Sequence, residues 1–455
     1  MEIFDLLVLG GGPGGYLCAE RASEGGLKVA LFEKKALGGT CLNEGCIPTK
    51  TLLNSSKMFR HAKESEAFGV TAENVKYDHA AVIERKNQVV KTLVGGVGAT
   101  MKAKKVTVIS AEAKISGKSQ NGFVIEANGE KYEGRRLCIA SGSETVVPPV
   151  PGLKEGLESG FVLTNREVLD EKTLPKTIVV IGGGVIGLEM AYYYASVGVQ
   201  VTVIEMMPKI AGATDPEICK VLTDAFTKRG MTFLLSSKVL EVKKNSVVYE
   251  KDGVKTEIEC DKVLLSAGRK PATSGIGLES LNLEMDRAAI KTDRNLKTNI
   301  SGVWAIGDCN GKLMLAHTAY REAEVAVNNM LGIPDEMRYD VIPSVIYTDP
   351  EVASVGISLD EAKEKGINAK EIKLPMSYAG RYLAETNGGK GFIKLVVDND
   401  KNRLIGVSMV GSYASEIIMT ATMMVDTELS PNRLKKLVFP HPTVAEIIRE
   451  AIFHI

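Results

Sequence analysis

Two cysteines five positions apart, Cys41 and Cys46, combine a residue type and a spacing that could do chemistry. They lie in the glycine-rich run GGTCLNEGC, residues 38–46. A zinc site prefers C-x-x-C spacing with further Cys or His nearby, and this neighbourhood lacks both. In an ideal helix the rise over five residues is about 7.5 Å, beyond the roughly 7 Å at which a disulfide can form. A disulfide here would therefore need a bent backbone, which the glycines allow, and two unpaired cysteines remain an alternative.

A second candidate group, His441 and Glu446, lies near the C-terminus in the pattern His-Pro-Thr-x-x-Glu. A histidine oriented by a carboxylate can act as a general base at neutral pH. The chain has only five histidines. A His beside a Glu is also common on protein surfaces, so the pair alone does not establish a catalytic role.

A glycine fingerprint near the N-terminus predicts the first nucleotide site. Gly10, Gly12 and Gly15 have G-x-G-x-x-G spacing directly after an apolar run, and a predicted helix and second strand lead to Glu33. In such a unit the glycines allow a tight turn and bring a pyrophosphate to the helix N-terminus. The acid at the end of the second strand binds ribose hydroxyls.

The same pattern recurs at Gly182, Gly184 and Gly187, and its second strand ends at Glu205. Positions 15 to 33 and 187 to 205 span the same 18-residue interval. Two copies in matching strand, helix and strand contexts predict two bound dinucleotides. A carboxylate at position 205 accepts from a free 2′-hydroxyl and repels a 2′-phosphate, and no basic residue follows it until Lys209. The second site therefore favours NAD over NADP.

Length and composition limit the other possibilities. The 455 residues suffice for about three domains, and 56 basic residues balance 56 acidic ones, so no basic field would attract nucleic acid. Seven cysteines are too few and too irregular for a secreted disulfide framework. The first apolar run lacks a preceding basic region, and no stretch reaches the roughly 18 apolar residues of a membrane span. We expect a cytoplasmic location.

The cysteine run, extended to Lys50, resembles the active-site motif of the dihydrolipoamide dehydrogenases, which are class I pyridine nucleotide-disulfide oxidoreductases. The resemblance implies that Cys46 is the thiolate beside FAD and that Cys41 exchanges with substrate. It also implies that Lys50 lies near the reactive flavin nitrogen, paired with Glu189.

At the other end of the chain, the resemblance implies that His441 and Glu446 form the acid–base dyad, which acts across a homodimer. Many family members carry another histidine two residues before this one, where this chain has Phe439. This departure concerns the local proton pathway and the preference for lipoamide.

The resemblance extends to further cofactor contacts. The run ending in Gly-Asp at 307–308 is similar to the family's second FAD motif, and the helix that follows would direct its N-terminal dipole at the flavin. His317 is expected beside the flavin through its backbone rather than as an acid or base. The additional residues implied for FAD are Gly39, Thr40, Lys50, Ala113, Asp308, Ala316 and His317, and the additional residue implied for NAD is Gly268.

The expected fold is α/β, with two Rossmann-like dinucleotide-binding domains and a C-terminal α+β dimerisation domain. We expect the first part of the FAD-binding domain at 1–148, the NAD-binding domain at 149–270, a segment completing the FAD region at 271–338 and the interface domain at 339–455. The segment 345–356 resembles the family's dimerisation domain.

The expected activity is oxidation of protein-bound dihydrolipoamide with reduction of NAD. The chain begins almost at the first strand, so the lipoyl group is expected on another protein, a carrier of a 2-oxo acid dehydrogenase or glycine cleavage complex. The alternatives are a glutathione- or mercury-directed reductase and a flavin-binding redox sensor. Glu205 argues against the NADP preference of the glutathione enzyme, and the tail lacks the terminal cysteine pair of the mercuric enzyme. A sensor gives no reason to keep both cysteines and the His441–Glu446 pair.

Overall fold

The computed structural model describes residues 3–455, and residues 1 and 2, at the start of the expected first domain, lie outside the description. The first sheet has seven strands in the order β3-β2-β1-β6-β5-β4, with β19 paired to β6. Its strands are β1 (Ile3–Leu9), β2 (Val29–Glu33), β3 (Thr107–Ser110), β4 (Ala113–Lys118), β5 (Phe123–Ala127), β6 (Glu130–Ile139) and β19 (Val303–Ala305).

The parallel part of this sheet is covered on both faces, which explains the continuous apolar run of β1. Helices pack on one face, while strands β4 and β5 and the segment 278–290 pack on the other, so β1 shows no alternation of polar and apolar residues. Helix α1 follows β1, and α8 packs against α1. The helices of this region are α1 (Pro13–Glu24), α2 (Gly39–Glu44), α3 (Cys46–Lys63), α4 (His79–Ala103) and α8 (Ala316–Met330).

A second parallel sheet, in the order β11-β10-β9-β15-β8, is inserted between β6 and β19 of the first. Its strands are β8 (Val162–Leu163), β9 (Thr177–Ile181), β10 (Gln200–Ile204), β11 (Thr232–Leu234) and β15 (Lys262–Leu265), and α5 (Leu153–Ser159), α6 (Val185–Ser196) and α7 (Pro216–Lys228) accompany it. A three-stranded antiparallel sheet adds β12 (Ser237–Val242), β13 (Ser246–Lys251) and β14 (Val254–Glu259).

Two short ribbons complete the connections to the inserted region. Strand β7 (Ser143–Thr145), on the way in, pairs antiparallel with β16 (Arg269–Pro271), on the way out. The second ribbon, β17 (Met285–Asp286) and β18 (Ala289–Ile290), precedes β19. The chain therefore enters and leaves the inserted region at one place.

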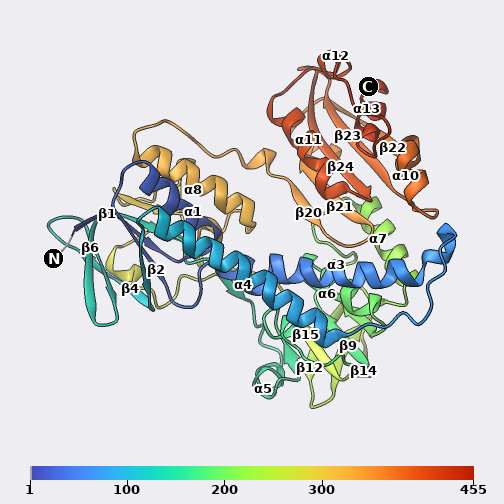
Figure 1. The fold of residues 1–455 in the computed structure, drawn as a ribbon, viewed down its shortest axis with the longest axis horizontal. Coiled ribbons are helices and arrows are strands. Elements are labelled where there is room, and N and C mark those ends of the chain that lie inside the picture. The colour runs from blue at the N-terminus through green and yellow to red at the C-terminus, as the bar shows by residue number, and fades with distance from the viewer. Residues whose placement is uncertain (1–2) are drawn as a thin grey trace.

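The C-terminal region is an antiparallel five-stranded sheet with helices, in the order β20-β21-β24-β23-β22. In Figure 1 it is orange to red and lies away from the first sheet. Its strands are β20 (Ser344–Ile346), β21 (Glu351–Gly356), β22 (Ala369–Pro375), β23 (Phe392–Asp398) and β24 (Arg403–Gly411). Its helices are α9 (Leu359–Glu364), α10 (Gly380–Glu385), α11 (Ala414–Asp426), α12 (Pro431–Leu434) and α13 (Glu446–Phe453).

One hydrophobic core joins the three regions. Leu52 of α3, Leu188 of α6 and Ile346 of β20 belong to the same cluster of buried side chains, together with Phe392 of β23. Lys394, which is also on β23, is almost fully buried and pairs with Asp215 at the start of α7 at 2.8 Å. The regions therefore share apolar and ionic contacts. Within residues 3–455, no helix is both long enough and apolar enough to cross a membrane.

Candidate active site

The two cysteines face each other because the helix that carries them is interrupted. Cys41 lies in α2, Cys46 is the first residue of α3, and Gly45 between the helices has φ −151° and ψ −105°. The turn before α2 uses left-handed glycines, with φ 96° at Gly38 and 54° at Gly39. The predicted bend is therefore present at Gly45. Both cysteines are free thiols, and their side chains form a hydrogen bond to each other.

The two thiols differ in acidity. The hydrogen bond from Cys41 lowers the pKa of Cys46 to about 7, and the nearby positive charge of Lys50 contributes in the same direction. The same hydrogen bond and burial raise the pKa of Cys41. Cys46 is therefore the thiolate of the pair near neutral pH, and Cys41 keeps its proton.

Lys50 and Glu189 form an ion pair beside the cysteines, in which the carboxylate is buried and the ammonium is partly exposed. Lys50 Nζ lies 2.7 Å from Glu189 Oε2, and Glu189 is only 3% exposed. The two residues are 139 positions apart and come from α3 and α6, which pack together. The structure thus brings together the pair that the resemblance implied.

His441 and Glu446 also lie together, at the start of α13. His441 Nδ1 is 2.9 Å from Glu446 Oε1, and Glu446 Oε2 accepts the Thr443 backbone N–H at 2.8 Å. The Thr443 backbone hydrogen bond, with His441 adding to it, lowers the pKa of Glu446, so this group is an acceptor. The Nδ1–H therefore donates, and Nε2 is left to accept a proton.

The histidine and the cysteines are far apart within one chain. The His441 side chain is 79% exposed. Figure 1 shows α13 on the far side of the C-terminal region from α3, the helix that begins at Cys46. One chain alone therefore does not bring this base to these thiols.

The two glycine loops have the same geometry. Gly10 and Gly182 have φ 109° and 105°, a conformation that suits glycine. A Cβ added at Gly15 would lie 1.7 Å from Gly10 O, and one at Gly187 would lie 2.3 Å from Gly182 O. The third glycine of each fingerprint therefore lets the helix pack against the strand that precedes it.

The acid at the end of each unit contacts its own glycine loop. Glu33 Oε2 accepts the Gly11 N–H at 2.8 Å, and Glu205 Oε2 accepts the Gly183 N–H at 2.6 Å. Each carboxylate thus lies beside the loop expected to hold the pyrophosphate. Beside the second loop, a Cβ added at Gly184 would meet nothing within 4 Å. This open space is what close approach of a dinucleotide requires.

The other residues expected at the flavin lie at the ends of strands and helices. Asp308 is in the 3-10 turn Gly307–Asn310 after β19, and its Oδ2 accepts the Ser143 hydroxyl at 2.5 Å. Ala316 is the first residue of α8. His317 donates from Nε2 to Pro343 O at 2.7 Å, so that nitrogen is occupied.

The remaining predicted residues lie at the starts of α2 and β4 and in the connection after β15. Gly39 and Thr40 open α2, and Gly39 lies beside Gly12. Ala113 begins β4. Gly268 has φ 104°, and its carbonyl accepts the Val146 N–H at 3.0 Å, at the ribbon that leads into the inserted region.

The structure adds residues that the sequence did not indicate. Asn165 Nδ2 donates to Glu44 O, between the two cysteines, at 2.7 Å. Glu322 on α8 is fully buried and accepts the Gly307 N–H at 2.5 Å, next to Asp308. A single acid in a helix rich in Ala and Glu gave no signal of this contact.

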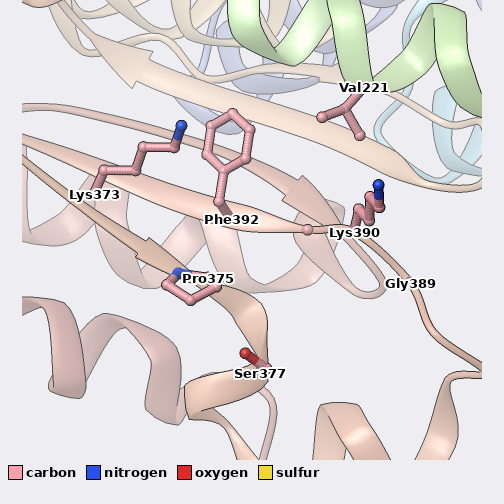
Figure 2. A pocket seen from close by; sticks show the side chains of 8 residues that line it. Val221, Lys373, Pro375, Ser377, Gly389, Lys390 and Phe392 are labelled. Carbon is pink, nitrogen blue, oxygen red and sulfur yellow. The ribbon is translucent and has the colours of Figure 1, made fainter.

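A cleft lies between α7 and the edge of the C-terminal sheet (Figure 2). It has a volume of about 440 Å³, and Val221 of α7 faces Phe392 across it, with Lys373 and Lys390 beside it. Lys373 pairs with Glu217 of α7 at 2.8 Å. None of the residues predicted for the active site lines this cleft.

Comparison with known proteins agrees with this geometry. The chain belongs to the pyridine nucleotide-disulphide oxidoreductase family, whose model matches residues 4–323 and whose dimerisation-domain model matches residues 342–452. Among its relatives is a dihydrolipoyl dehydrogenase of Bacillus subtilis (strain 168), 37% identical over 98% of this chain and 97% of the relative. A dihydrolipoyl dehydrogenase of Thermus scotoductus is 38% identical over 99% of this chain and 97% of the relative.

Solved structures of similar proteins cover the whole chain. LpdA from Mycobacterium tuberculosis is 25% identical, with a TM-score of 0.90 and 99% coverage of both chains. The HOCl-induced flavoprotein disulfide reductase RclA from Escherichia coli is 26% identical, with a TM-score of 0.86 and 99% coverage of both. The expected α/β fold with two nucleotide-binding units and a dimerisation domain is confirmed. FAD and NAD are the cofactors of such a chain.

Proposed function

We propose that this protein oxidises dihydrolipoamide to lipoamide and reduces NAD, with Cys41 and Cys46 as the redox-active pair. The observation that carries the proposal is the bent segment that holds two thiols of unequal acidity beside the Lys50–Glu189 pair. The full-length relatives that carry the name dihydrolipoyl dehydrogenase support the same activity.

The cysteines perform the exchange with substrate. In the oxidised enzyme, one substrate thiolate attacks Cys41 Sγ, which breaks the Cys41–Cys46 bond and leaves Cys46 as a thiolate. The second substrate sulfur then attacks the substrate sulfur that is bonded to Cys41. This step breaks the mixed disulfide, closes the lipoamide ring and releases Cys41 as a thiolate. FAD, when bound, relays the electron pair from the dithiol to NAD. The lowered pKa of Cys46 keeps the released sulfur ionised.

His441 is assigned as the base that takes the proton from the substrate thiol. Its Nε2 is free because Nδ1 donates to Glu446, which also fixes the orientation of the ring. The separation of this histidine from Cys41 within one chain supports a site completed by a second subunit. The matched dimerisation domain, 342–452, contains His441.

The first glycine loop is assigned to FAD and the second to NAD. On the flavin side, Gly10, Gly12, Gly15 and Glu33 would hold the adenosine diphosphate half, and Asp308 the ribityl chain. On the nicotinamide side, Glu205 would accept from the free 2′-hydroxyl of NAD and repel the phosphate of NADP. Glu205 therefore argues against the glutathione-directed alternative.

The partner is proposed to be a separate lipoyl-bearing carrier protein of a 2-oxo acid dehydrogenase or glycine cleavage complex, in the cytoplasm. The small number of cysteines fits a reducing compartment.

The deciding experiment compares two steady-state reactions of the purified holoenzyme. Dihydrolipoamide with NAD is expected to turn over efficiently, and glutathione disulfide with NADPH is not. The Cys41→Ser variant is the matched control and is expected to lose the first reaction while it retains FAD. Preference for glutathione disulfide and NADPH would overturn the proposal.

A further inference from the structure

We propose that Tyr347 is a positioning residue that holds the Lys50–Glu189 pair beside Cys46, a role that rests on the proposed function of that site. Tyr347 follows directly after β20, in the C-terminal region. Lys50 and Glu189 come from α3 and α6. The inference therefore joins the third region of the chain to the site of electron transfer.

Tyr347 contacts both members of the ion pair with different groups. Its backbone N–H donates to Glu189 Oε1 at 3.0 Å, while Glu189 Oε2 accepts from Lys50 Nζ at 2.7 Å. Its ring lies under the same ammonium, with Lys50 Nζ 4.4 Å from the ring centroid. Both carboxylate oxygens are thus occupied, and the ammonium lies between a negative group and an aromatic face.

Burial explains why the pair needs such support. A carboxylate removed from water is costly unless its oxygens accept hydrogen bonds, and Glu189 is almost fully buried. The Tyr347 N–H provides the second of these bonds. The Lys50 side chain is only partly buried and has a long flexible stem, so its ammonium could turn toward solvent. An aromatic face within about 6 Å favours the inward position.

The position of this ammonium matters for Cys46. The charged groups that act on the Cys46 sulfur are Lys50 and Arg269, which favour the thiolate, and Glu189, which disfavours it. Without the ring, Lys50 would spend less time near Cys46, and a larger share of the thiolate's stabilisation would depend on Cys41 and Arg269.

The ring rather than the phenol hydroxyl makes the contact with Lys50. The Tyr347 residue is 39% exposed, so a change of its side chain does not open a buried cavity. Phenylalanine keeps the aromatic face and leucine removes it. The backbone N–H that serves Glu189 is present in both variants.

The test measures the acidity of Cys46 in the FAD-bound protein, in a Cys41→Ser background where Cys46 is the only redox-site thiol. The long-wavelength absorbance of the thiolate–flavin contact is followed against pH. Tyr347→Leu is expected to lower the acid dissociation constant of Cys46 about 2- to 5-fold, which means that its pKa rises. This fold-change corresponds to the usual free energy of a partly exposed cation–π contact. Tyr347→Phe is expected to match the parent.

Tyr378→Leu is the matched control, because Tyr378 is an exposed tyrosine of the same region that packs against His454. An unchanged titration in Tyr347→Leu, or equal shifts in the Phe and Leu variants, would overturn the inference. If the Leu variant fails to retain FAD, Tyr347→Met is compared in its place. The measurement uses no substrate, so failure of the wild-type enzyme to oxidise dihydrolipoamide would contradict the proposed function and leave this result standing.

Discussion

Cys41 and Cys46 carry the same functional group in different electrostatic surroundings. Both thiols are half-buried, but Cys46 accepts a hydrogen bond from Cys41 and lies near the Lys50 ammonium, while Cys41 is the donor. The asymmetry fits two separate tasks, with one sulfur for the flavin and one for the substrate. It also makes the pair sensitive to pH in a defined direction.

The first prediction concerns that pH dependence. The pKa of Cys46 is lowered to about 7, so its thiolate is present above that pH and is lost as the pH falls through it. Two-electron reduced enzyme is therefore expected to show a thiolate–flavin absorbance band that disappears on acidification between about pH 9 and pH 5. Cys46→Ser should lack the band, and Cys41→Ser should keep part of it. A band that survives in Cys46→Ser would reverse the assignment of the two sulfurs.

The second prediction concerns Glu205 and the choice of nicotinamide. A hydrogen bond to a charged group contributes roughly 1.5 to 3 kcal/mol, so Glu205→Ala should lower kcat/KM for NAD about 10- to 100-fold and narrow the discrimination against NADP. Glu33→Ala is the matched control, since Glu33 makes the equivalent contact in the first loop. The Glu33→Ala variant should bind less FAD, but its ratio of kcat/KM for NAD to kcat/KM for NADP should be unchanged. If Glu205→Ala leaves this ratio unchanged, the ribose is not bound at Glu205.

At the scale of elements, the strand–turn–helix units separate two roles of glycine. Gly187 has no room for a side chain, because its Cβ would collide with the carbonyl of Gly182. Gly184 lies in the same loop beside open space. Gly187 is required by the packing of α6 on β9, whereas Gly184 leaves room for the dinucleotide that is expected in this loop.

The third prediction follows from this difference. Gly187→Ala is expected to lower the free energy of unfolding by about 1 to 3 kcal/mol or more, as overpacking does, and to lower the melting temperature. Gly184→Ala should melt near the wild-type temperature yet bind NAD at least about 10-fold more weakly, because its methyl group would occupy the space of the pyrophosphate. Thermal melts and NAD titrations of both variants distinguish the effects. Equal losses of stability would show that Gly184 is also a packing position.

Local motifs were predictable from the sequence, whereas contacts between elements were not. The glycine loops, Glu205 and the pair His441–Glu446 were predictable because each motif is local, with all its members on one turn or one strand end. The contact between Lys50 and Glu189 needed the family resemblance, since it depends on how α3 packs against α6.

The contacts of Tyr347 were not predictable from the sequence for a related reason. Its position depends on where β20 places it against residues from two other regions of the chain. An aromatic residue after a short strand is ordinary in sequence, and no local pattern signals a partner 158 positions away.

At the scale of the whole molecule, the separation of His441 from Cys41 leads to the fourth prediction. A two-fold dimer would contain two composite sites, each with cysteines from one subunit and the base from the other. Mixing inactive Cys41→Ser subunits with inactive His441→Gln subunits should restore activity, because one site of each hybrid carries both changes and the other carries neither. If about half of the dimers are hybrids, recovery should reach roughly a quarter of wild type.

This result requires proof that hybrids form, which native mass spectrometry supplies. A mixture of Cys41→Ser and Cys46→Ser subunits is the matched control. Both changes lie in the cysteine half of the composite site, so each of the two sites in a hybrid contains a damaged cysteine pair. Hybrids without activity would mean that His441 acts within its own subunit or lies outside the chemistry.

The domain order was predictable because the second fingerprint interrupts the first sheet, and β19 returns to pair with β6. The mutual packing of the three regions was not predictable. The side chains of the shared core come from α3, from the helices and strands of the inserted region, and from the C-terminal sheet. The apolar pattern of each segment indicates that it is buried but does not indicate which partner covers it.

That shared core also determines how the protein loses its structure. Domains joined only by linkers melt one after another, each with its own heat-absorption peak. Here Leu52, Leu188 and Ile346 belong to one cluster, so loosening any region exposes apolar surface of the other two. Calorimetry would therefore record a single cooperative peak. Damage in the C-terminal sheet would therefore release the flavin at the same temperature at which the whole chain unfolds.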